Sequence, residues 1–270
     1  MIQQPNQEQL RSLTLVERTA YRIGDLCNRK LKSPLTWWNY TMMNILIWFG
    51  LSRRLHIHGM EHLKQYNENS RIILICNHRT FFDFFVISWV TFNKTKLPKR
   101  IFFPVRSTFF YTTWIGIPFC FFMGGYSMFP PIMRESSKRT FNRYAIQRVV
   151  DELKSQGTLV GFHPEGTRNK SSDPHSLLPP KKGVGEVFQL YPEATVLPVY
   201  IRGITNNLLR EFWCNWLSAK KTPIDVYFGP PAQCPDLLQA EHTSENHQKI
   251  SEHCMQSIHS LAALHKERRP

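Results

Sequence analysis

The sequence feature that most constrains the fold is the apolar run Ile-Ile-Leu-Ile-Cys at residues 72–76, which leads directly into Asn77 and His78. A short continuous apolar run followed by polar residues predicts a strand buried in the interior of a sheet. The polar residues after it then lie at the edge of that sheet. Any fold for this chain therefore needs further strands beside this one and a histidine at their edge.

Further segments predict a sheet of several strands with helices between them. Strands are expected at residues 55–58, 71–76, 100–105, 158–162, 195–201 and 224–228. Helices are expected at residues 81–92, 136–156, 183–190 and 244–266. Strands that alternate with helices predict the α/β class, here a single largely parallel sheet flanked by helices. The 270 residues are enough for one large domain of this kind, which we assign to residues 53–270.

The first 52 residues predict a pair of helices associated with a membrane. Residues 8–30 carry apolar side chains at helical spacing, and residues 35–51 are rich in Trp, Met and Ile. No charged residue lies between Lys32 and Arg53. The second helix is short for a bilayer span, which needs about 20 residues, whereas Trp near both ends and flanking Lys and Arg fit a helix in the membrane interface. A helix packed on the sheet is the alternative.

Residues 107–133 form a second long apolar segment, which contains no Asp, Glu, His, Lys or Arg. By length alone this segment could cross a membrane. Several glycines and prolines interrupt it, so one continuous helix is not expected. We predict a folded apolar wall that accommodates an acyl chain, and a membrane-spanning hairpin is the alternative.

The charge balance indicates the kind of partner that the protein binds. The 34 Lys and Arg residues exceed the 20 Asp and Glu residues, which gives a formal net charge of +14, and 13% of the residues are aromatic. A basic chain rich in aromatics suits a membrane surface. Nucleic acid is not expected as a partner, because the aromatics cluster with aliphatic residues rather than with Lys and Arg. We therefore expect a peripheral or monotopic protein on the cytoplasmic face of a membrane.

The six cysteines do not predict a metal centre or a set of disulfides. No two of them have the C-x-x-C spacing, and residues 1–9 are too polar for a signal peptide. Reduced and partly buried thiols are therefore expected. We predict that the protein binds no metal and needs no cofactor other than its substrates.

His78 and Asp83 have the side chains of a general base. A carboxylate can hold a histidine in one tautomer, which leaves the other ring nitrogen to take a proton. On a regular helix, side chains five residues apart point to different faces. The two therefore meet only if His78 lies in the turn before a helix and Asp83 in its first turn; the alternative is that each merely caps its own element. No serine or cysteine partner is expected beside them, which indicates direct activation of a substrate hydroxyl.

A second polar turn, residues 163–168, also follows a predicted strand and has the sequence His-Pro-Glu-Gly-Thr-Arg. Ligands of open α/β sheets bind beyond the carboxyl ends of the strands, so the two turns are expected to meet at one cleft. Gly166 lets the backbone approach a ligand closely, and Arg168 offers a planar fork for phosphate. Glu165 is expected to accept from a hydroxyl or to hold Arg168, and a surface salt bridge between these two is the alternative. Lys182, just before a helix, adds a further site for an anion.

Together these motifs resemble blocks of the glycerolipid acyltransferase family, and most of all its 1-acylglycerol-3-phosphate (lysophosphatidic acid) acyltransferases. The matching blocks are Asn77-His78 with Asp83, residues 162–168, Lys182-Gly183 and Leu197-Pro198-Val199. The resemblance covers about residues 50–230, in the family's order. An isolated His-x-x-x-x-Asp is a weak signal, but joined to Pro-Glu-Gly-Thr-Arg at this separation it is a strong one.

The resemblance implies an acyltransferase that moves a fatty acyl group from an acyl thioester to the free hydroxyl of a lysophospholipid, with 1-acylglycerol 3-phosphate as the leading candidate. His78 would deprotonate the acceptor hydroxyl, and Asp83 would orient His78. The donor would be acyl-CoA or acyl carrier protein, the latter being a protein partner. The residues expected to bind substrate are Asn77, Arg79, Arg106, Glu165, Gly166, Thr167, Arg168 and Lys182.

The chain departs from the family in its second block, where a basic residue, a Pro/Gly stretch and a phosphate-binding arginine are expected. Arg106 fits the first position, but Pro130 and Pro131 lie where the arginine is expected, and Arg134 comes a few residues late. Arg134 could still serve through a bulged loop, or the acceptor could be another lysolipid. A lipid hydrolase with the same histidine–aspartate pair and a non-enzymatic lipid-binding protein are the other functions to distinguish.

Overall fold

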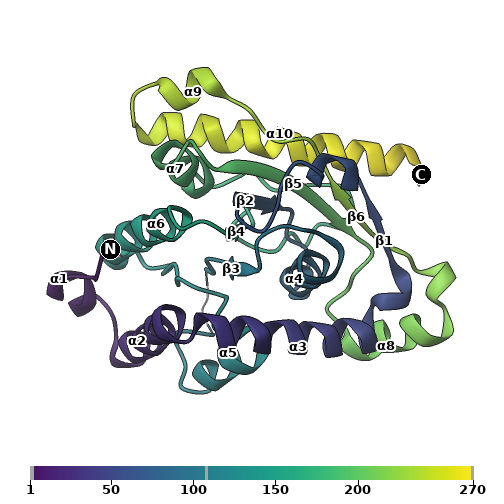
Figure 1. Ribbon diagram of the computed structural model, residues 1–270, viewed down its shortest axis with the longest axis horizontal. Coiled ribbons are helices and arrows are strands. Elements are labelled where there is room, and N and C mark those ends of the chain that lie inside the picture. The colour runs from purple at the N-terminus through teal and green to yellow at the C-terminus, as the bar shows by residue number, and fades with distance from the viewer. Residues whose placement is uncertain (1–2, 107–108, 269–270) are drawn as a thin grey trace.

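The computed structural model describes residues 3–106 and 109–268 and contains one six-stranded sheet covered by helices (Figure 1). The strands are β1 (Leu55–His58), β2 (Arg71–Cys76), β3 (Arg100–Phe102), β4 (Thr158–Phe162), β5 (Thr195–Arg202) and β6 (Ile224–Phe228). Their order across the sheet is β1-β6-β5-β2-β4-β3. Each predicted strand is present, and the α/β class with a single sheet is confirmed.

The sheet is parallel except at one boundary. The neighbours β5, β2, β4 and β3 are parallel, β6 runs antiparallel to β5, and β1 is parallel to β6. In the β5–β6 register Arg202 lies opposite Asp225. The carboxyl ends of β2, β4 and β5 therefore share one edge of the sheet with the start of β6, and the predicted site lies at that edge.

Helices cover both faces of the sheet. The longer helices are α2 (Leu15–Lys30), α3 (Lys32–Gly50), α4 (Asp83–Lys94), α5 (Gly116–Gly124), α6 (Arg139–Leu153), α7 (Gly183–Leu190), α8 (Leu208–Leu217) and α10 (Ser244–Arg268). The shorter ones are α1 (Gln7–Arg11), α9 (Pro235–Gln239) and the 3₁₀ turns η1 (Ser52–Arg54), η2 (Met60–Leu63), η3 (Ser136–Lys138) and η4 (Ala219–Lys221). In Figure 1, α7 and α10 lie above the sheet, and α4 and α3 lie below it. Residues 72–76 of β2 are fully buried as a result.

The helix α4 is apolar almost all round because it is enclosed on both sides. It lies between the sheet and α3 (Figure 1), and it packs against α3. Phe84, Phe85, Val86 and Val90 are all buried. The helix begins at Asp83 rather than at residue 81, because the turn after β2 continues through Phe82.

The N-terminal segment folds as three helices rather than two. The single helix expected at residues 8–30 is wrong, because the chain breaks between α1 and α2. The side chain of Thr14 accepts from the backbone amide of Glu17 (3.4 Å), and the Glu17 carboxylate accepts from the backbone amide of Thr14 (2.9 Å). This reciprocal capping box satisfies two amides that a new helix would otherwise leave unpaired, so α2 begins here.

Buried ion pairs attach α2 to α6. The fully buried guanidinium of Arg148 contacts Asp25 (2.6 Å) and Glu152 (2.8 Å). Near the start of α6, Lys138 pairs with Glu17 at 2.6 Å. Removing one partner of a buried pair costs about 3–5 kcal/mol, because the other charge is left without compensation. These pairs bind the N-terminal segment firmly to the rest of the molecule, whereas the division into residues 1–52 and 53–270 stays a prediction.

The helix α3 packs by one face and exposes the other. Met43 and Ile47 are buried where α3 meets α4, α5 and α8, whereas Trp37 and Trp48 are 67% and 54% exposed. The inner face thus behaves as a core helix. Among the described residues, no helix combines the length and the apolarity that crossing a membrane requires. Membrane association of the outer face of α3 stays a prediction.

The apolar segment at residues 107–133 folds around α5, and its first two residues lie outside the described ranges. The nine-residue α5 is preceded by turns and followed by an irregular segment, so no continuous helix forms, as predicted. Tyr111 and Phe129 are buried, whereas Trp114 and Ile115 are 58% and 67% exposed. The expected role as a wall for an acyl chain stays a prediction.

Candidate active site

The turn between β2 and α4 is held by one carboxylate. Asp83 is buried, and its Oδ2 accepts from Nδ1 of His78 (3.1 Å) and from the backbone amides of Arg79 and Thr80 (2.9 Å each). Its Oδ1 accepts from the hydroxyl of Thr80 (2.6 Å). The histidine lies in the turn and the aspartate opens the helix, which is the arrangement in which their side chains can meet.

The same contacts determine the protonation of the pair. Burial alone would raise the pKa of Asp83, but the hydrogen bond and the charge of His78 outweigh it and lower that pKa below its ordinary value. Asp83 is therefore ionised at neutral pH, and Nδ1 of His78 carries the proton of their hydrogen bond. Nε2 of His78 is then the basic nitrogen. The His78 side chain is 22% exposed, so a substrate can reach it.

The ring of His163 is stacked on the ring of His78. The two centroids are 3.9 Å apart, and the ring planes differ by 9°. Nδ1 of His163 donates to the backbone carbonyls of Cys76 and Asn77 (3.1 Å each), because a carbonyl can only accept. Burial and the adjacent His78 lower the pKa of His163 to about 3. His163 is therefore neutral at neutral pH and gives the His78 ring a flat, uncharged support.

Glu165 connects the two predicted turns from the inside. It is 1% exposed, and its carboxylate accepts from the backbone amides of His78 (2.8 Å) and Leu178 (3.0 Å). Burial raises the pKa of Glu165, against the opposing effect of these two amides. The two turns meet as predicted. The carboxylate contacts backbone, and no ion pair joins it to Arg168 among the described residues, so the expected support of that arginine is not formed.

Asn77 and Arg79 hold the same turn on neighbouring segments. The buried side chain of Asn77 accepts from the backbone amide of Ile201 (2.8 Å) and donates to its carbonyl (2.9 Å). The guanidinium of Arg79 donates hydrogen bonds of 2.6 to 3.3 Å to carbonyls within residues 171–176. Both residues thus position His78. Their expected contacts with substrate stay predictions.

The remaining residues of the second turn are more open. Gly166 has a φ of 66°, a left-handed conformation that glycine adopts without strain. Thr167 and Arg168 are exposed, and the Arg168 guanidinium donates a long hydrogen bond to Asn206 (3.4 Å). Lys182 precedes α7 and donates to the hydroxyl of the first residue of α10 (2.8 Å). Arg168 is therefore exposed to solvent, whereas Lys182 is directed toward α10.

Arg106 and Arg134 lie near one small parallel bridge. Val105 pairs with Pro131, and the amide of Ile132 donates to the Val105 carbonyl (2.9 Å). Both arginines are exposed. Arg134 thus follows the segment around Pro131, which runs beside the segment that leads into Arg106. Its role in binding phosphate stays a prediction.

A covalent nucleophile is not present beside the histidine in the described part of the chain. Cys76 is adjacent in sequence but fully buried, and burial, together with Asp83 and Glu165, raises the pKa of its thiol well above the ordinary value. A thiol attacks as its thiolate, so this one is inert. The ring of His78 bonds to a carboxylate and not to a serine or cysteine. The geometry therefore fits direct activation of a bound hydroxyl or water.

Three side chains of the site also have the spacing of metal ligands. One ligand atom each of His78, Asp83 and His163 lies within 4.8 Å of the other two. Two imidazoles and a carboxylate suit divalent ions such as zinc. The expectation that the reaction needs no metal therefore stays a prediction.

Sequence reasoning missed three residues that shape the site. The motif at residues 163–168 includes His163, but no role was predicted for it, and none was predicted for Thr80 or Asn206. The one available signal was that a histidine follows the predicted strand at residues 158–162, much as His78 follows β2. Asn206 accepts from the amide of Phe81 (2.8 Å), a contact between distant segments that no local pattern predicts.

The fold and the site define an α/β enzyme with a histidine–aspartate pair at the carboxyl edge of its sheet. The protein-family model described as Acyltransferase matches residues 54–202, which is more than half of the chain. The protein belongs to this acyltransferase family. A solved structure of the 1-acyl-sn-glycerophosphate (LPA) acyltransferase PlsC from Thermotoga maritima is similar at 17% sequence identity and a TM-score of 0.49, over 95% of this chain and 97% of that chain. A comparison with curated proteins found no match.

The depressed pKa of His163 predicts how stability depends on pH. The unfolded chain binds a proton at this histidine below about pH 6.5, whereas the folded protein binds it only near pH 3. Between these values the free energy of unfolding therefore falls as the pH falls, by at most about 1.4 kcal/mol per pH unit. His163→Phe should remove this part of the loss. Urea unfolding at pH 7 and pH 4.5 measures it.

The matched control is His259→Phe, which changes an exposed histidine of α10. It should keep the pH dependence of the unaltered protein. Equal losses of stability on acidification in His163→Phe and in the unaltered protein would show that His163 is not held neutral by the fold.

Proposed function

We propose that the protein transfers a fatty acyl group from an acyl thioester, acyl-CoA or acyl carrier protein, to the free hydroxyl of a lysophospholipid, with 1-acylglycerol 3-phosphate as the first candidate acceptor. The observation that carries the proposal is the pairing of His78 with the ionised Asp83 beside the second polar turn, in a chain of the acyltransferase family. The reaction needs no cofactor besides the acyl donor.

In this reaction His78 acts as a general base. Nε2 takes the proton of the acceptor hydroxyl while the hydroxyl oxygen attacks the thioester carbonyl. The tetrahedral intermediate then collapses, the carbon–sulfur bond breaks, and the proton on Nε2 passes to the departing thiolate. Asp83 stays ionised throughout and stabilises the imidazolium, because its hydrogen bonds favour the charged carboxylate. An ester and a free thiol are the products.

Three exposed arginines on the turns and loops of the site region support a phosphorylated acceptor. Arg168 lies in the second turn, and Arg106 and Arg134 extend from the neighbouring bridge. A guanidinium forms paired hydrogen bonds with phosphate oxygens and is the side chain best suited to them. Arg134 comes a few residues after the position where the family has its phosphate-binding arginine, so the acceptor could differ from that of the family. Another lysolipid is therefore the alternative within the same reaction.

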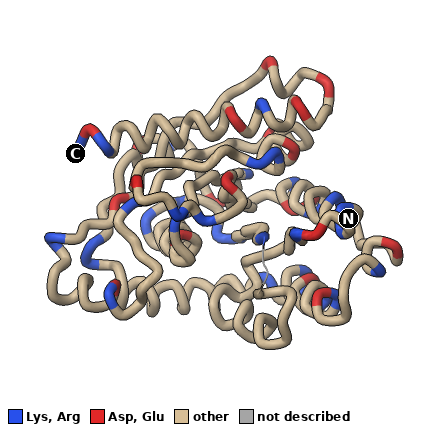
Figure 2. The backbone as a smooth tube through the Cα atoms, turned by 180° about the vertical axis from the view of Figure 1, so that it is seen from behind, with Lys and Arg blue, Asp and Glu red and all other residues tan. Residues whose placement is uncertain are grey.

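An exposed apolar surface supports a site of action at a membrane. We call this surface the aromatic face. It lies on α3, around α5 and on α8, and both α5 and α8 pack against α3. Its residues are Trp37, Tyr40, Ile45, Trp48, Phe49, Trp114, Ile115, Phe119, Phe122, Leu208, Leu209, Phe212, Trp213 and Leu217. Figure 2 shows that α3 carries almost no charged residue along its length.

Large apolar surfaces rimmed by polar residues are typical of membrane or protein contacts. Trp and Tyr favour the membrane interface, and the net charge of +14 favours anionic headgroups. We propose that the aromatic face rests on the cytoplasmic face of a membrane, as a peripheral or monotopic contact. The lysolipid acceptor would then reach the site from the lipid phase.

The proposed role of His78 predicts the effect of its removal. His78→Ala should lower the transfer rate at least about 100-fold, because a positioned general base contributes about 10²- to 10⁴-fold. The control His253→Ala changes an exposed histidine of α10 and should transfer at the normal rate. Transfer of a labelled acyl group from acyl-CoA to lysolipid measures both. If His78→Ala is folded and transfers normally, His78 is not the base.

The aromatic face predicts how the protein binds vesicles. The double variant Trp37→Ser and Trp213→Ser should float with vesicles of phosphatidylcholine and phosphatidylglycerol at least several-fold less than the unaltered protein, because each change removes a large interfacial side chain. The control variant Leu15→Ser and Leu190→Ser removes two exposed apolar side chains outside this face. Equal flotation of all three proteins would contradict the proposed contact.

A further inference from the structure

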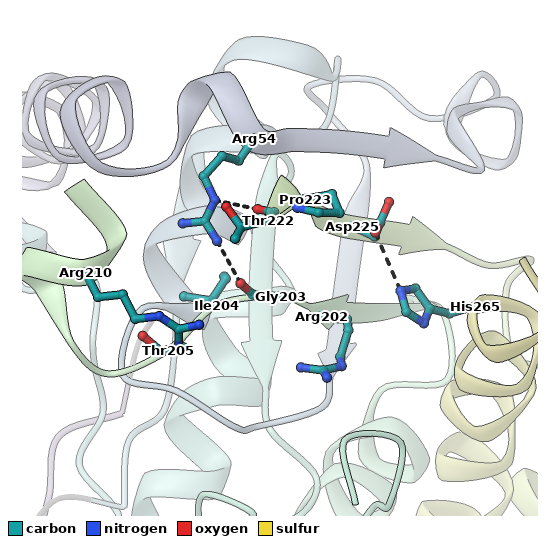
Figure 3. A pocket seen from close by; sticks show the side chains of 10 residues that line it. All are labelled: Arg54, Arg202, Gly203, Ile204, Thr205, Arg210, Thr222, Pro223, Asp225 and His265. Carbon is teal, nitrogen blue, oxygen red and sulfur yellow. Dashed lines mark hydrogen bonds and ion pairs between the residues drawn. The ribbon is translucent and has the colours of Figure 1, made fainter. Parts of the chain in front are cut away.

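A cavity of about 400 Å³ lies at the sheet edge that carries His78 (Figure 3). Its walls come from the end of β5, the loop after it, α8 and the segment before β6. Three arginines line it: Arg54 before β1, Arg202 at the end of β5 and Arg210 in α8. No motif in the sequence pointed to this cavity, because its arginines are far apart in the chain.

The three arginines differ in what they contact. Arg54 is buried and fully engaged, since its guanidinium pairs with Glu211 and donates to the backbone carbonyls of Thr222 (2.6 Å) and Gly203 (3.0 Å). It is part of the wall. The guanidinium groups of Arg202 and Arg210 have no hydrogen bond or ion pair with any residue of the described ranges. They are the charges that a ligand would meet.

Arg202 is the more enclosed of these two arginines. The residue is half-buried, and burial lowers the pKa of its guanidinium. A desolvated charge without a partner destabilises a folded protein. An anion in the cavity could accept charge-assisted hydrogen bonds from this guanidinium. Arg210, by contrast, is exposed on α8 and adds a second positive charge to the lining of the cavity.

The lining also contains a carboxylate, which is already engaged. Oδ1 of Asp225 lies 3.0 Å from Nε2 of His58, and its Oδ2 lies 3.5 Å from Nε2 of His265. Figure 3 shows the Arg202 side chain directed away from Asp225, although the two residues face each other across the β5–β6 register. Arg202 and Arg210 are thus left to a ligand rather than neutralised by this carboxylate.

Two contacts connect the cavity with the catalytic turn. The side-chain amide of Asn77 accepts from the backbone N–H of Ile201 (2.8 Å) and donates to the Ile201 carbonyl (2.9 Å). Arg202 is the next residue in the chain. In the loop that follows, Asn206 accepts from the amide of Phe81 (2.8 Å). The cavity wall is therefore attached to the turn that carries His78.

We propose that this cavity is a phosphate-binding site in which Arg202 and Arg210 hold the anion. Two guanidinium forks can meet several phosphate oxygens at once, which a single arginine cannot. The source of the phosphate rests on the proposed function: it belongs either to the CoA of the acyl donor or to the glycerol phosphate of the acceptor. Both present the same chemistry to the cavity.

Calorimetric titration of the full chain with CoA, 3′-dephospho-CoA, glycerol 3-phosphate and inorganic phosphate tests the site. Arg202→Gln and Arg210→Gln should each weaken binding of at least one of these ligands by about 10- to 100-fold, because each removes a charge-assisted contact. The control Arg143→Gln changes an exposed arginine of α6 and should bind normally. A loss confined to the CoA ligands assigns the phosphate to the donor, and a loss confined to glycerol 3-phosphate assigns it to the acceptor.

The proposal is overturned if the unaltered protein binds none of these ligands, or if both variants bind all of them as Arg143→Gln does. Arg202→Lys provides a second variant that keeps the charge and removes the fork, and it should bind more weakly than the unaltered protein but more strongly than Arg202→Gln. His78→Ala should keep this binding while losing transfer. Binding and acyl transfer are therefore measured separately, and a failure of the proposed function does not change the outcome of the binding test.

Discussion

The structure of the site depends on the four hydrogen bonds that the buried carboxylate of Asp83 accepts. They come from the ring of His78, from two backbone amides and from the hydroxyl of Thr80. A buried carboxylate without such partners would be strongly destabilising, so the chain can bury Asp83 only if the turn closes around it. The same negative charge suits the start of α4, where the helix dipole favours an anion. Folding the turn and orienting the histidine are therefore one event.

Two more buried polar side chains extend this constraint to other strands. Glu165, after β4, accepts from the amide of His78, and Asn77, after β2, holds the backbone of Ile201 in β5. Three neighbouring strands are thus tied together at their carboxyl ends. A base held by such contacts needs little rearrangement when substrate binds, which is how rigid scaffolds support a reactive group. The stacked ring of His163 closes the remaining side.

The sequence predicted the strands and the meeting of the two turns, because runs such as residues 72–76 are buried and leave polar residues at their ends. It did not predict α8, since that helix exposes Leu209 (74%) and Trp213 (58%) and buries Glu211 (1%), which inverts the pattern used to detect surface helices. The sequence also could not predict that the ring of His163 stacks on the ring of His78. That contact depends on β2 and β4 being neighbours in one register, with Ile75 opposite Phe162. Local patterns contain no such information.

The most direct test of the account measures thiol release from acyl-CoA or acyl carrier protein by the purified protein, with and without a panel of lysolipids. Direct transfer from thioester to hydroxyl predicts that free thiol appears only when an acceptor is present, in amounts equal to the new ester. The acceptor that supports the fastest release identifies the substrate. Release of thiol at the same rate without any acceptor, accompanied by free fatty acid, would contradict the account and show that the protein hydrolyses the thioester.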